Sequence, residues 1–239
     1  NIVNLSNNHI YDFGKKSYDL TKEILDQNNI KYFGIEGKDL KIQFNENNII
    51  LDGFCCYSTN PLGINDHNND GINDLDVETV STKLKNNLKD NLFTIFSFHC
   101  GQEHVNYPNY DHVELARKLA SIGPYIFYGH HPHVAQGIEK VNDSLIAYSL
   151  GNFCFDDVYT EKSKNPIIKQ TENNKESFIL ELTVEKNKLL EHKIVPVYLD
   201  NDKMTLNRFE IVDKIDNYSK KLLTDSVAYK IYRKQLVDN

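Results

Sequence analysis

The chain has 239 residues and a formal net charge of −7, and its lysines and arginines are spread along the sequence. Because phosphate backbones are bound by a concentrated positive face, this charge pattern argues against a nucleic-acid partner. The longest apolar runs, such as LFTIFSF at residues 92–98, are far too short to cross a bilayer, so we expect no transmembrane segment in this chain.

The domain organisation follows from length and composition. No break in composition divides the chain, and its length suffices for one large core. We predict one domain over residues 1–200 and a C-terminal helical extension over residues 201–239. The chain begins without a methionine and directly on a strand-like segment, from which we expect that preceding residues have been removed.

The first part of the chain alternates strand-like and helix-like segments. The apolar alternation of NIVNL at residues 1–5 predicts a strand, and helical spacing predicts a helix over residues 16–28 with Tyr18 and Ile24 on one face. Further strands are predicted over residues 31–35, 47–54 and 55–59. Residues 61–74 are rich in Gly, Asn and Asp, which predicts an exposed, mobile surface loop without a ligand role.

The second part continues this alternation. Asp76 is expected to cap a helix that extends to Leu88, and Asn109 to cap a helix that extends to Ala120. Strands are predicted over residues 92–98, 124–128 and 145–149, a hairpin over 177–199 and a helical segment over 208–237. Strands that alternate with helices before a late hairpin predict a layered α/β domain with a mixed sheet.

Four of the predicted strands end in clusters of polar residues. The sequences that follow them are SNNHIYDFG, HCGQEH, GHHPH and LGNF. In open α/β sheets, ligands bind outside the carboxyl ends of the strands, so we expect these four clusters to converge on one site. A purely structural origin would instead scatter the histidines among helices and loops.

The GHHPH segment suggests how two of its histidines are oriented. Pro132 disfavours the helical region for His131 and moves it toward an extended conformation. In an extended chain, alternate side chains point to the same side. We therefore expect His131 and His133 to point together, while His130 faces away.

The chemistry of the clustered residues suits a divalent metal ion. Neutral imidazoles from His99, His131 and His133, with the amide oxygen of Asn8, suit zinc, manganese or iron better than calcium or magnesium. The alternative is that the histidines form polar turns and that Asn8 caps a loop.

Two carboxylates and two further histidines have open roles. Asp12 lies three residues after His9 and is placed to fix the tautomer of that ring or to act as its acid–base partner. Asp12 and Glu103 also fit the role of helix-capping or surface carboxylates. A hydrogen-bonded structural role fits His104 and His130 as well as a role in the site.

The remaining histidines and the cysteines carry no predicted role. His67 lies in a polar loop and His192 in the predicted hairpin, so both are expected at the surface. The four cysteines lack the CxxC spacing of zinc knuckles and predict buried or half-buried free thiols, which favours a reducing, cytoplasmic compartment.

The motifs NLSNNHIYDFG, FHCGQEH, YGHHPHVAQG and AYSLGNFCF, in this order, resemble a bacterial capsule-synthesis family. The family is often called CapA or poly-γ-glutamate biosynthesis proteins, and it is a branch of the calcineurin-like metallophosphoesterase superfamily. The resemblance covers about residues 2–200. It implies a four-layer α/β/β/α sandwich with mixed sheets and a metal centre at the sheet's edge.

The resemblance also implies roles for individual residues. Asn8, His99, His131 and His133 match the metal ligands of the superfamily. His9 matches the histidine that protonates a leaving group, with Asp12 as its partner. As candidate substrate contacts at the wall of the site we place four residues: Glu103, His130, Ser149 and Asn152.

This sequence departs from the family pattern at its start. The family's acidic motifs, one of which supplies an aspartate that bridges two metals, would lie upstream of Asn1. The residues of this chain supply ligands for about one metal, so the metal count is left at one or two and hydrolysis by this chain alone is expected to be weak or absent. A longer chain that restores these motifs is expected to bind a second metal and gain activity, and an upstream anchor would place the protein outside the membrane.

Two classes of function follow. The first is a metal-dependent hydrolase of capsule or poly-γ-glutamate biosynthesis, in which an activated water attacks a phosphoester or amide-type linkage and His9 protonates the leaving group. The second is a non-catalytic binding or assembly factor for an anionic cell-surface polymer. The expected partners are that polymer or a small phosphorylated or amide substrate, with other capsule-synthesis proteins.

Overall fold

The computed structural model describes residues 1–64, 71–200, 203–206 and 208–238. Its strands are β1 (Ile2–Asn4), β2 (Lys31–Phe33), β3 (Leu40–Phe44), β4 (Asn47–Cys55), β5 (Phe93–His99), β6 (Ile126–His130), β7 (Ile138–Val141), β8 (Ser144–Ala147), β9 (Glu176–Glu185), β10 (Lys188–Asp200) and β11 (Lys203–Leu206). Its helices are α1 (Gly14–Gln27), α2 (Val77–Lys89), α3 (Tyr110–Ile122), α4 (Glu172–Lys175), α5 (Glu210–Lys220) and α6 (Ser226–Val237), with a 3-10 turn at Pro61–Gly63.

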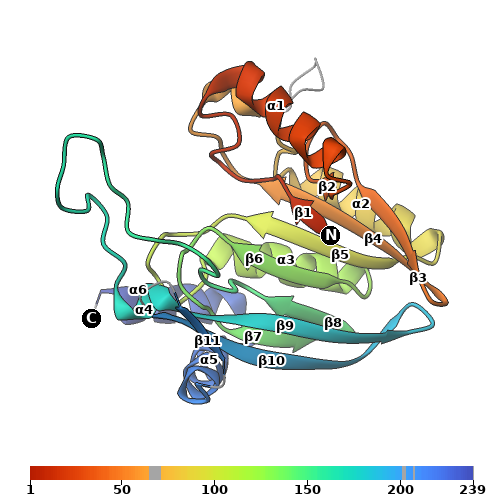
Figure 1. Ribbon diagram of the computed structural model, residues 1–239. Helices are drawn as coiled ribbons and strands as arrows, with labels where there is room; N and C mark the ends of the chain where they lie inside the picture. The colour runs from red at the N-terminus through yellow and green to blue at the C-terminus, as the bar shows by residue number, and fades with distance from the viewer. Residues whose placement is uncertain (65–70, 201–202, 207, 239) are drawn as a thin grey trace.

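A mixed six-stranded sheet forms the centre of the fold (Figure 1). Its strand order is β3-β4-β5-β6-β8-β7, in which β4, β5, β6 and β8 run parallel while β3 and β7 are antiparallel at the edges. Among the described residues, β1 and β2 form a parallel pair and β9, β10 and β11 an antiparallel sheet. The predicted α/β class with a mixed sheet is confirmed.

Alternation along β5 divides its side chains between the two faces of the sheet. Phe96 and Phe98 pack with the apolar residues of α2 and α3 in the largest core cluster, on the face that these helices cover (Figure 1). Phe93 and Ile95 lie on the opposite face, in a cluster with residues of the β9–β10 hairpin. His99 shares the parity of Phe93 and Ile95, so the strand directs its imidazole away from the helices.

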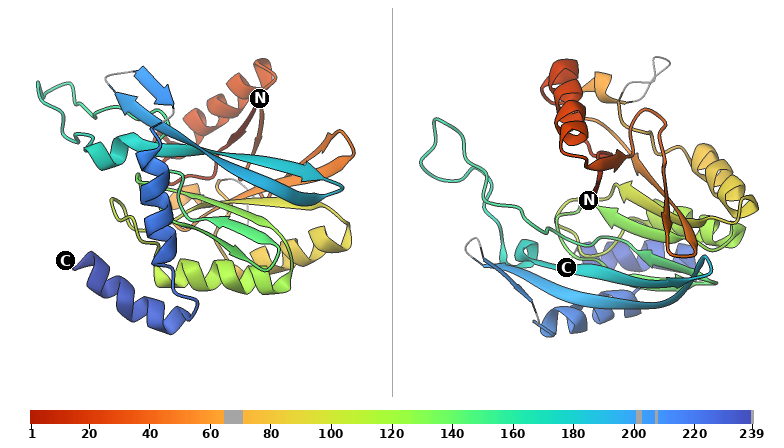
Figure 2. Two further views of the ribbon diagram at one scale, coloured as in Figure 1. Left: turned by 90° about the horizontal axis from the view of Figure 1, so that it is seen from below. Right: turned by 45° about the vertical axis from the view of Figure 1, so that its right-hand side comes forward.

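The β9–β10 hairpin and α5 complete the other side of the sheet (Figure 2). Phe178 of β9 and Tyr198 of β10 are buried together with Ile211 and Ile215 of α5 and with Ala147 of β8. The burial of these large side chains against β8 fixes the hairpin on the sheet, because apolar area removed from water is the main stabilising contribution.

Most predicted elements are present, but three strands were not predicted and the buried face of α1 was predicted only in part. The Asp76 side chain accepts a hydrogen bond from the Thr79 amide at the start of α2, whereas Asn109 precedes α3 without a side-chain cap. Residues 47–55 form one strand instead of two, and β3, β7 and β11 were not predicted. Tyr18 is buried on α1 as expected, but Ile24 is 49% exposed.

The loop prediction for residues 61–74 is wrong at its C-terminal end. Ile72 is fully buried and bridges Ile35 and Ile64. Asn73 is buried as well, where it accepts a hydrogen bond from Gly37 N and donates one to Asp52. The centre of the predicted loop, including His67, lies outside the described residues.

The predicted C-terminal helical segment consists of two helices, α5 and α6. No helix in the described ranges is long and apolar enough to span a membrane. All four cysteines are free. Cys55 and Cys100 are buried as expected, but Cys56 and Cys154 are exposed, so the prediction of buried or half-buried thiols holds for half of them.

Candidate metal centre

The predicted site residues gather at the carboxyl ends of the parallel strands, where the topology places strand-following segments side by side. His99 is the last residue of β5, and the loop after β6 carries His131 and His133. The turn between β1 and α1 joins this edge because the carbonyl oxygen of Asn8 accepts a hydrogen bond from the amide of Thr59 at 2.9 Å.

His99 and Asn8 form the buried end of the site. The Nε2 atom of His99 lies 2.8 Å from Oδ1 of Asn8, and the exposed fractions of the two residues are 8% and 2%. The Nδ2 group of Asn8 donates to the hydroxyl of Tyr57 at 2.8 Å. This second hydrogen bond fixes the amide so that its oxygen points toward His99.

We predicted that His130 faces away from the site, but its ring contacts that of His99. The two Nδ1 atoms lie 2.5 Å apart, so one ring must donate and the other accept. On its other side, His130 Nε2 lies 3.1 Å from the Asn4 amide nitrogen and 2.8 Å from the Ser97 hydroxyl. Since Asn4 can only donate there, the consistent arrangement protonates His130 on Nδ1 and leaves Nδ1 of His99 unprotonated.

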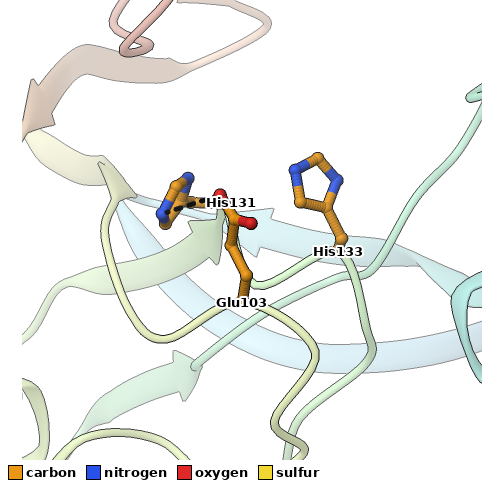
Figure 3. Close-up of side chains that lie close together, drawn as sticks. All are labelled: Glu103, His131 and His133. Carbon is orange, nitrogen blue, oxygen red and sulfur yellow. Dashed lines mark ion pairs between the residues drawn. The ribbon is translucent and has the colours of Figure 1, made fainter. Parts of the chain in front are cut away.

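Glu103, His131 and His133 form the open end of the site, and Figure 3 shows their side chains around a common space. One ligand atom from each residue lies within 4.8 Å of the others, a cluster that could hold a metal ion. Glu103 Oε1 is 3.8 Å from His131 Nε2. The rings of His99 and His131 lie 4.7 Å apart between centroids, which places the two ends of the site side by side.

The backbone of the GHHPH segment differs from the extended form that we predicted. His131 has φ of 104° and His133 has φ of 59°, both in the left-handed region that side chains with a Cβ rarely adopt. The two rings still approach to 6.2 Å, but through strained backbone instead of strand alternation. Such strain persists only where surrounding contacts impose it, and it is concentrated at functional sites.

Burial lowers the pKa of three imidazoles in the site. Removal from water lowers the pKa of His99 to about 2 and that of His130 to about 4, and neighbouring imidazoles add to both effects. Burial also lowers the pKa of His131, against the opposing influence of the Glu103 carboxylate. These rings are neutral near pH 7, and a neutral imidazole has the lone pair that a metal requires.

His9 and Asp12 form an exposed pair at the mouth of the site. His9 Nδ1 lies 2.7 Å from Asp12 Oδ2, and the side chain of His9 is 62% exposed. The other oxygen of Asp12 accepts a hydrogen bond from Thr59, and this bond, together with His9, lowers the pKa of Asp12. The ionised Asp12 therefore holds the Nδ1 proton of His9 and leaves Nε2, which is 3.2 Å from Asn8 Nδ2, directed toward the site.

Of the two predicted substrate contacts after β8, Asn152 bonds to a histidine of the site and Ser149 to the backbone of its own turn. Asn152 Oδ1 lies 2.9 Å from His133 Nδ1, so it holds that tautomer and leaves Nε2 of His133 free. Ser149 is fully buried, and its hydroxyl accepts from the amide of Gly151 at 3.3 Å. Ser149 is thus a buried residue of the turn that follows β8. His192 is half-buried on β10, away from these residues.

Four residues that contact the site were missed in the sequence. Asn4 and Ser97 orient His130, Tyr57 orients Asn8, and Thr59 binds Asp12. Ser97 could have been found, because it lies two residues before His99 and alternate residues of a strand share a face. The other three are polar residues whose sequence contexts resemble ordinary turn and strand positions.

The donor atoms fit a divalent metal ion. Two ligands that share a metal through bonds of about 2.1 Å lie roughly 3 Å apart, close to the 2.8 Å between His99 Nε2 and Asn8 Oδ1. At the open end, a ring nitrogen of His133 and a carboxylate oxygen of Glu103 lie within 4.8 Å of each other. Neutral imidazoles with one amide and one carboxylate oxygen suit zinc, manganese or iron.

Together, the fold and the site define an α/β protein with a histidine-rich candidate metal centre at the carboxyl edge of a mixed sheet. Residues 1–157 match the family described as bacterial capsule synthesis protein PGA_cap, and the chain belongs to this family, as its motifs predicted. It is 30% identical over 174 residues to the PGA biosynthesis protein CapA of Bacillus subtilis, an alignment that covers 70% of this chain and 46% of that protein.

A second relative extends along nearly the whole chain. The capsule biosynthesis protein CapA of Bacillus anthracis is 26% identical over 253 residues, which cover 99% of this chain and 59% of that protein. The chain thus spans about half the length of the curated relatives that it matches.

Proposed function

We propose that this chain is the metal-binding part of a CapA-like protein and acts as a metal-dependent hydrolase on a phosphoester or amide-type linkage. One observation carries the proposal: buried, neutral imidazoles from separate strand ends meet an amide oxygen and a carboxylate at one sheet edge. Buried histidines with lowered pKa values that converge on one edge of a sheet are typical of functional sites.

The donor groups suit one or two ions of manganese, zinc or iron. His99 and Asn8 offer one set of donor atoms, and Glu103, His131 and His133 offer a second. The 4.7 Å between the rings of His99 and His131 supports either one ion held by both sets or two neighbouring ions.

The residues of the chain supply binding and proton transfer around that centre. A bound divalent metal would contribute Lewis acidity at the scissile bond. His9 is exposed, and Asp12 accepts its Nδ1 proton and so stabilises the doubly protonated ring, which can pass its Nε2 proton to the leaving group and return to the neutral form. Asn152 holds His133 in the tautomer whose Nε2 is unprotonated. Metal binding through Nε2 of His99 requires that ring to carry its proton on Nδ1, the atom that faces His130.

The fold and the domain division are part of the same proposal. We propose that the mixed α/β fold is the four-layer α/β/β/α sandwich of the calcineurin-like type, which is supported by the packing of α2 and α3 on one face of the central sheet and of the β9–β10 hairpin on the other. The proposed units are residues 1–200 as the metallophosphoesterase-like domain and residues 201–239 as a helical extension. Family membership supports this proposal.

The substrate class is proposed from the relatives. The Bacillus subtilis relative is named for PGA biosynthesis and the Bacillus anthracis relative for capsule biosynthesis, so we propose an anionic polymer, or a phosphorylated or amide intermediate, as the substrate. The alternative is a non-catalytic binding or assembly factor for that polymer. The net charge of −7 opposes binding of a polyanion over a broad surface and favours recognition at the metal site.

A comparison of turnover and binding tests the proposal. The chelated protein is supplied with Mn²⁺, Zn²⁺ or Fe²⁺ and assayed with a phosphodiester and with poly-γ-glutamate, alongside His9→Ala and the matched control His192→Ala. We expect metal-dependent turnover that His9→Ala reduces by about 100-fold and His192→Ala leaves unchanged. Metal-dependent polymer binding without turnover would support the assembly factor, and neither binding nor turnover would contradict both functions.

A further inference from the structure

The loop between β5 and α3, residues 100–109, carries Glu103 and is anchored by a helix from the far end of the chain. Arg233 of α6 donates from Nη2 to Gln102 Oε1 at 3.0 Å and to Asn109 Oδ1 at 2.9 Å. Its Nε donates to the carbonyl oxygen of Tyr107 at 3.1 Å. One guanidinium group thus joins the residue beside Glu103 to the end of the same loop.

Both C-terminal helices add contacts to this loop. Tyr229 of α6 is fully buried and donates its hydroxyl to the carbonyl oxygen of Pro108 at 2.9 Å. Lys221 follows the last residue of α5, and its ammonium lies 3.0 Å from the hydroxyl of Tyr107. The ring of Tyr218 in α5 packs edge-on against Tyr107 at 5.7 Å. The loop is therefore held at its C-terminal part by the helical extension.

The opposite side of the loop is bonded to the segment that carries the histidines. The His104 amide donates to the carbonyl oxygen of Pro132 at 2.8 Å, and Gln136 Nε2 donates to that of Val105 at 2.7 Å. The side chain of Glu103 is 49% exposed, and its carboxylate lies 3.8 Å from Nε2 of His131. Its position consequently depends on how the loop backbone is held.

We infer that α6, through Arg233, positions Glu103 for metal binding, so that the C-terminal extension sets the metal affinity of the site. This inference rests on the proposed metal centre. A guanidinium group presents a rigid fork of donors, and an arginine that binds three acceptors in one loop restricts that loop more than a lysine can. Arg233 is a positioning residue, since it contacts neither the donor atoms nor the space between them.

Metal titration of the full chain tests this inference. Mn²⁺ affinity is measured by calorimetry, and Co²⁺ binding by visible absorption, for the wild type, Arg233→Ala, Arg233→Lys and Gln102→Ala, with Lys234→Ala as the matched control on the exposed side of α6. Loss of groups that orient metal ligands typically costs 10–100-fold in metal affinity. We expect about a 10-fold loss for Arg233→Ala, a smaller loss for Arg233→Lys and Gln102→Ala, and none for Lys234→Ala.

A double-mutant cycle separates positioning of Glu103 from a general structural effect. Arg233→Ala is expected to weaken metal binding in the wild type but to add less than about twofold when Glu103→Gln is already present. The same loss in both backgrounds, or wild-type affinity in Arg233→Ala, would overturn the inference while leaving the metal centre intact. Failure of the wild type to bind metal would overturn the proposed function as well, so the two failures are distinguishable.

Discussion

Gly129, at the end of β6, controls the position of the whole GHHPH segment. A Cβ atom added there would lie 2.8 Å from the carbonyl carbon of Tyr148 and would overlap its oxygen. Carbon atoms in favourable contact are about 3.5–4.0 Å apart. The obstacle is backbone of the segment after β8, so Gly129→Ala must move β6 away from that segment by several tenths of an ångström or more.

The loss of stability in Gly129→Ala depends on the atoms that the added Cβ displaces. Overpacking of a tight interior costs about 1–3 kcal/mol, and we expect the upper end because a backbone group cannot rotate away. For a chain of this length, each kcal/mol lowers the melting temperature by about 2–4 °C. Gly129→Ala should therefore melt about 6–12 °C lower, and displacement of His131 should weaken metal binding at the same time.

The assay is thermal unfolding in the presence of a chelator, followed by metal titration. Gly123→Ala is the matched control, because the added Cβ would meet the end of the flexible Leu88 side chain at 2.5 Å, far from the site. We expect that control to stay within about 1 kcal/mol of the wild type. If Gly129→Ala is as stable as Gly123→Ala and binds metal normally, the argument that this glycine sets the site is wrong.

Three further predictions concern stability and proton transfer. Arg117→Ala removes the guanidinium that binds Glu139 at 2.8 Å and Thr224 O at 3.0 Å, so urea denaturation should show a loss of about 3 kcal/mol, unlike the exposed control Lys118→Ala. Burial lowers the pKa of His112. The buried, neutral His112 contributes fully to the free energy of unfolding above about pH 6.5, and this contribution is lost as the pH falls and the unfolded state binds a proton. The free energy of unfolding of His112→Gln should therefore decrease less than that of the wild type between pH 7 and 5. Asp12→Asn should reduce turnover by about 100-fold with unchanged metal affinity in calorimetry, and a matching loss of affinity would contradict its assignment as the partner of His9.

The sequence predicted where the residues of the candidate site gather, because the carboxyl ends of parallel strands lie along one edge of a sheet. Apolar strands that end in polar clusters place those clusters along one edge of a parallel sheet, and His99, His131 and Asn8 lie together there. The strands that were missed are at sheet edges, such as β3 and β11, whose residues are largely exposed and mix charged with apolar side chains. Their conformation depends on pairing with a neighbour, which a local pattern does not encode.

The finer geometry of the site depends on tertiary contacts. The positive φ angles of His131 and His133 are imposed by the packed loops around them, so the local effect of Pro132 predicted a different backbone. The place of Glu103 depends on Arg233, 130 positions later in the chain, and that contact leaves no local signal in the sequence.

Crystals of the chain grown with Mn²⁺ and measured at the manganese absorption edge would test the metal centre most directly. We predict anomalous density within bonding distance of Asn8 Oδ1 and His99 Nε2, or of Glu103, His131 and His133, at about 2.0–2.3 Å from nitrogen and oxygen donors. Replacing His99 and His131 by alanine should abolish it. Manganese bound only at other residues, or no anomalous density at saturating Mn²⁺, would contradict the account.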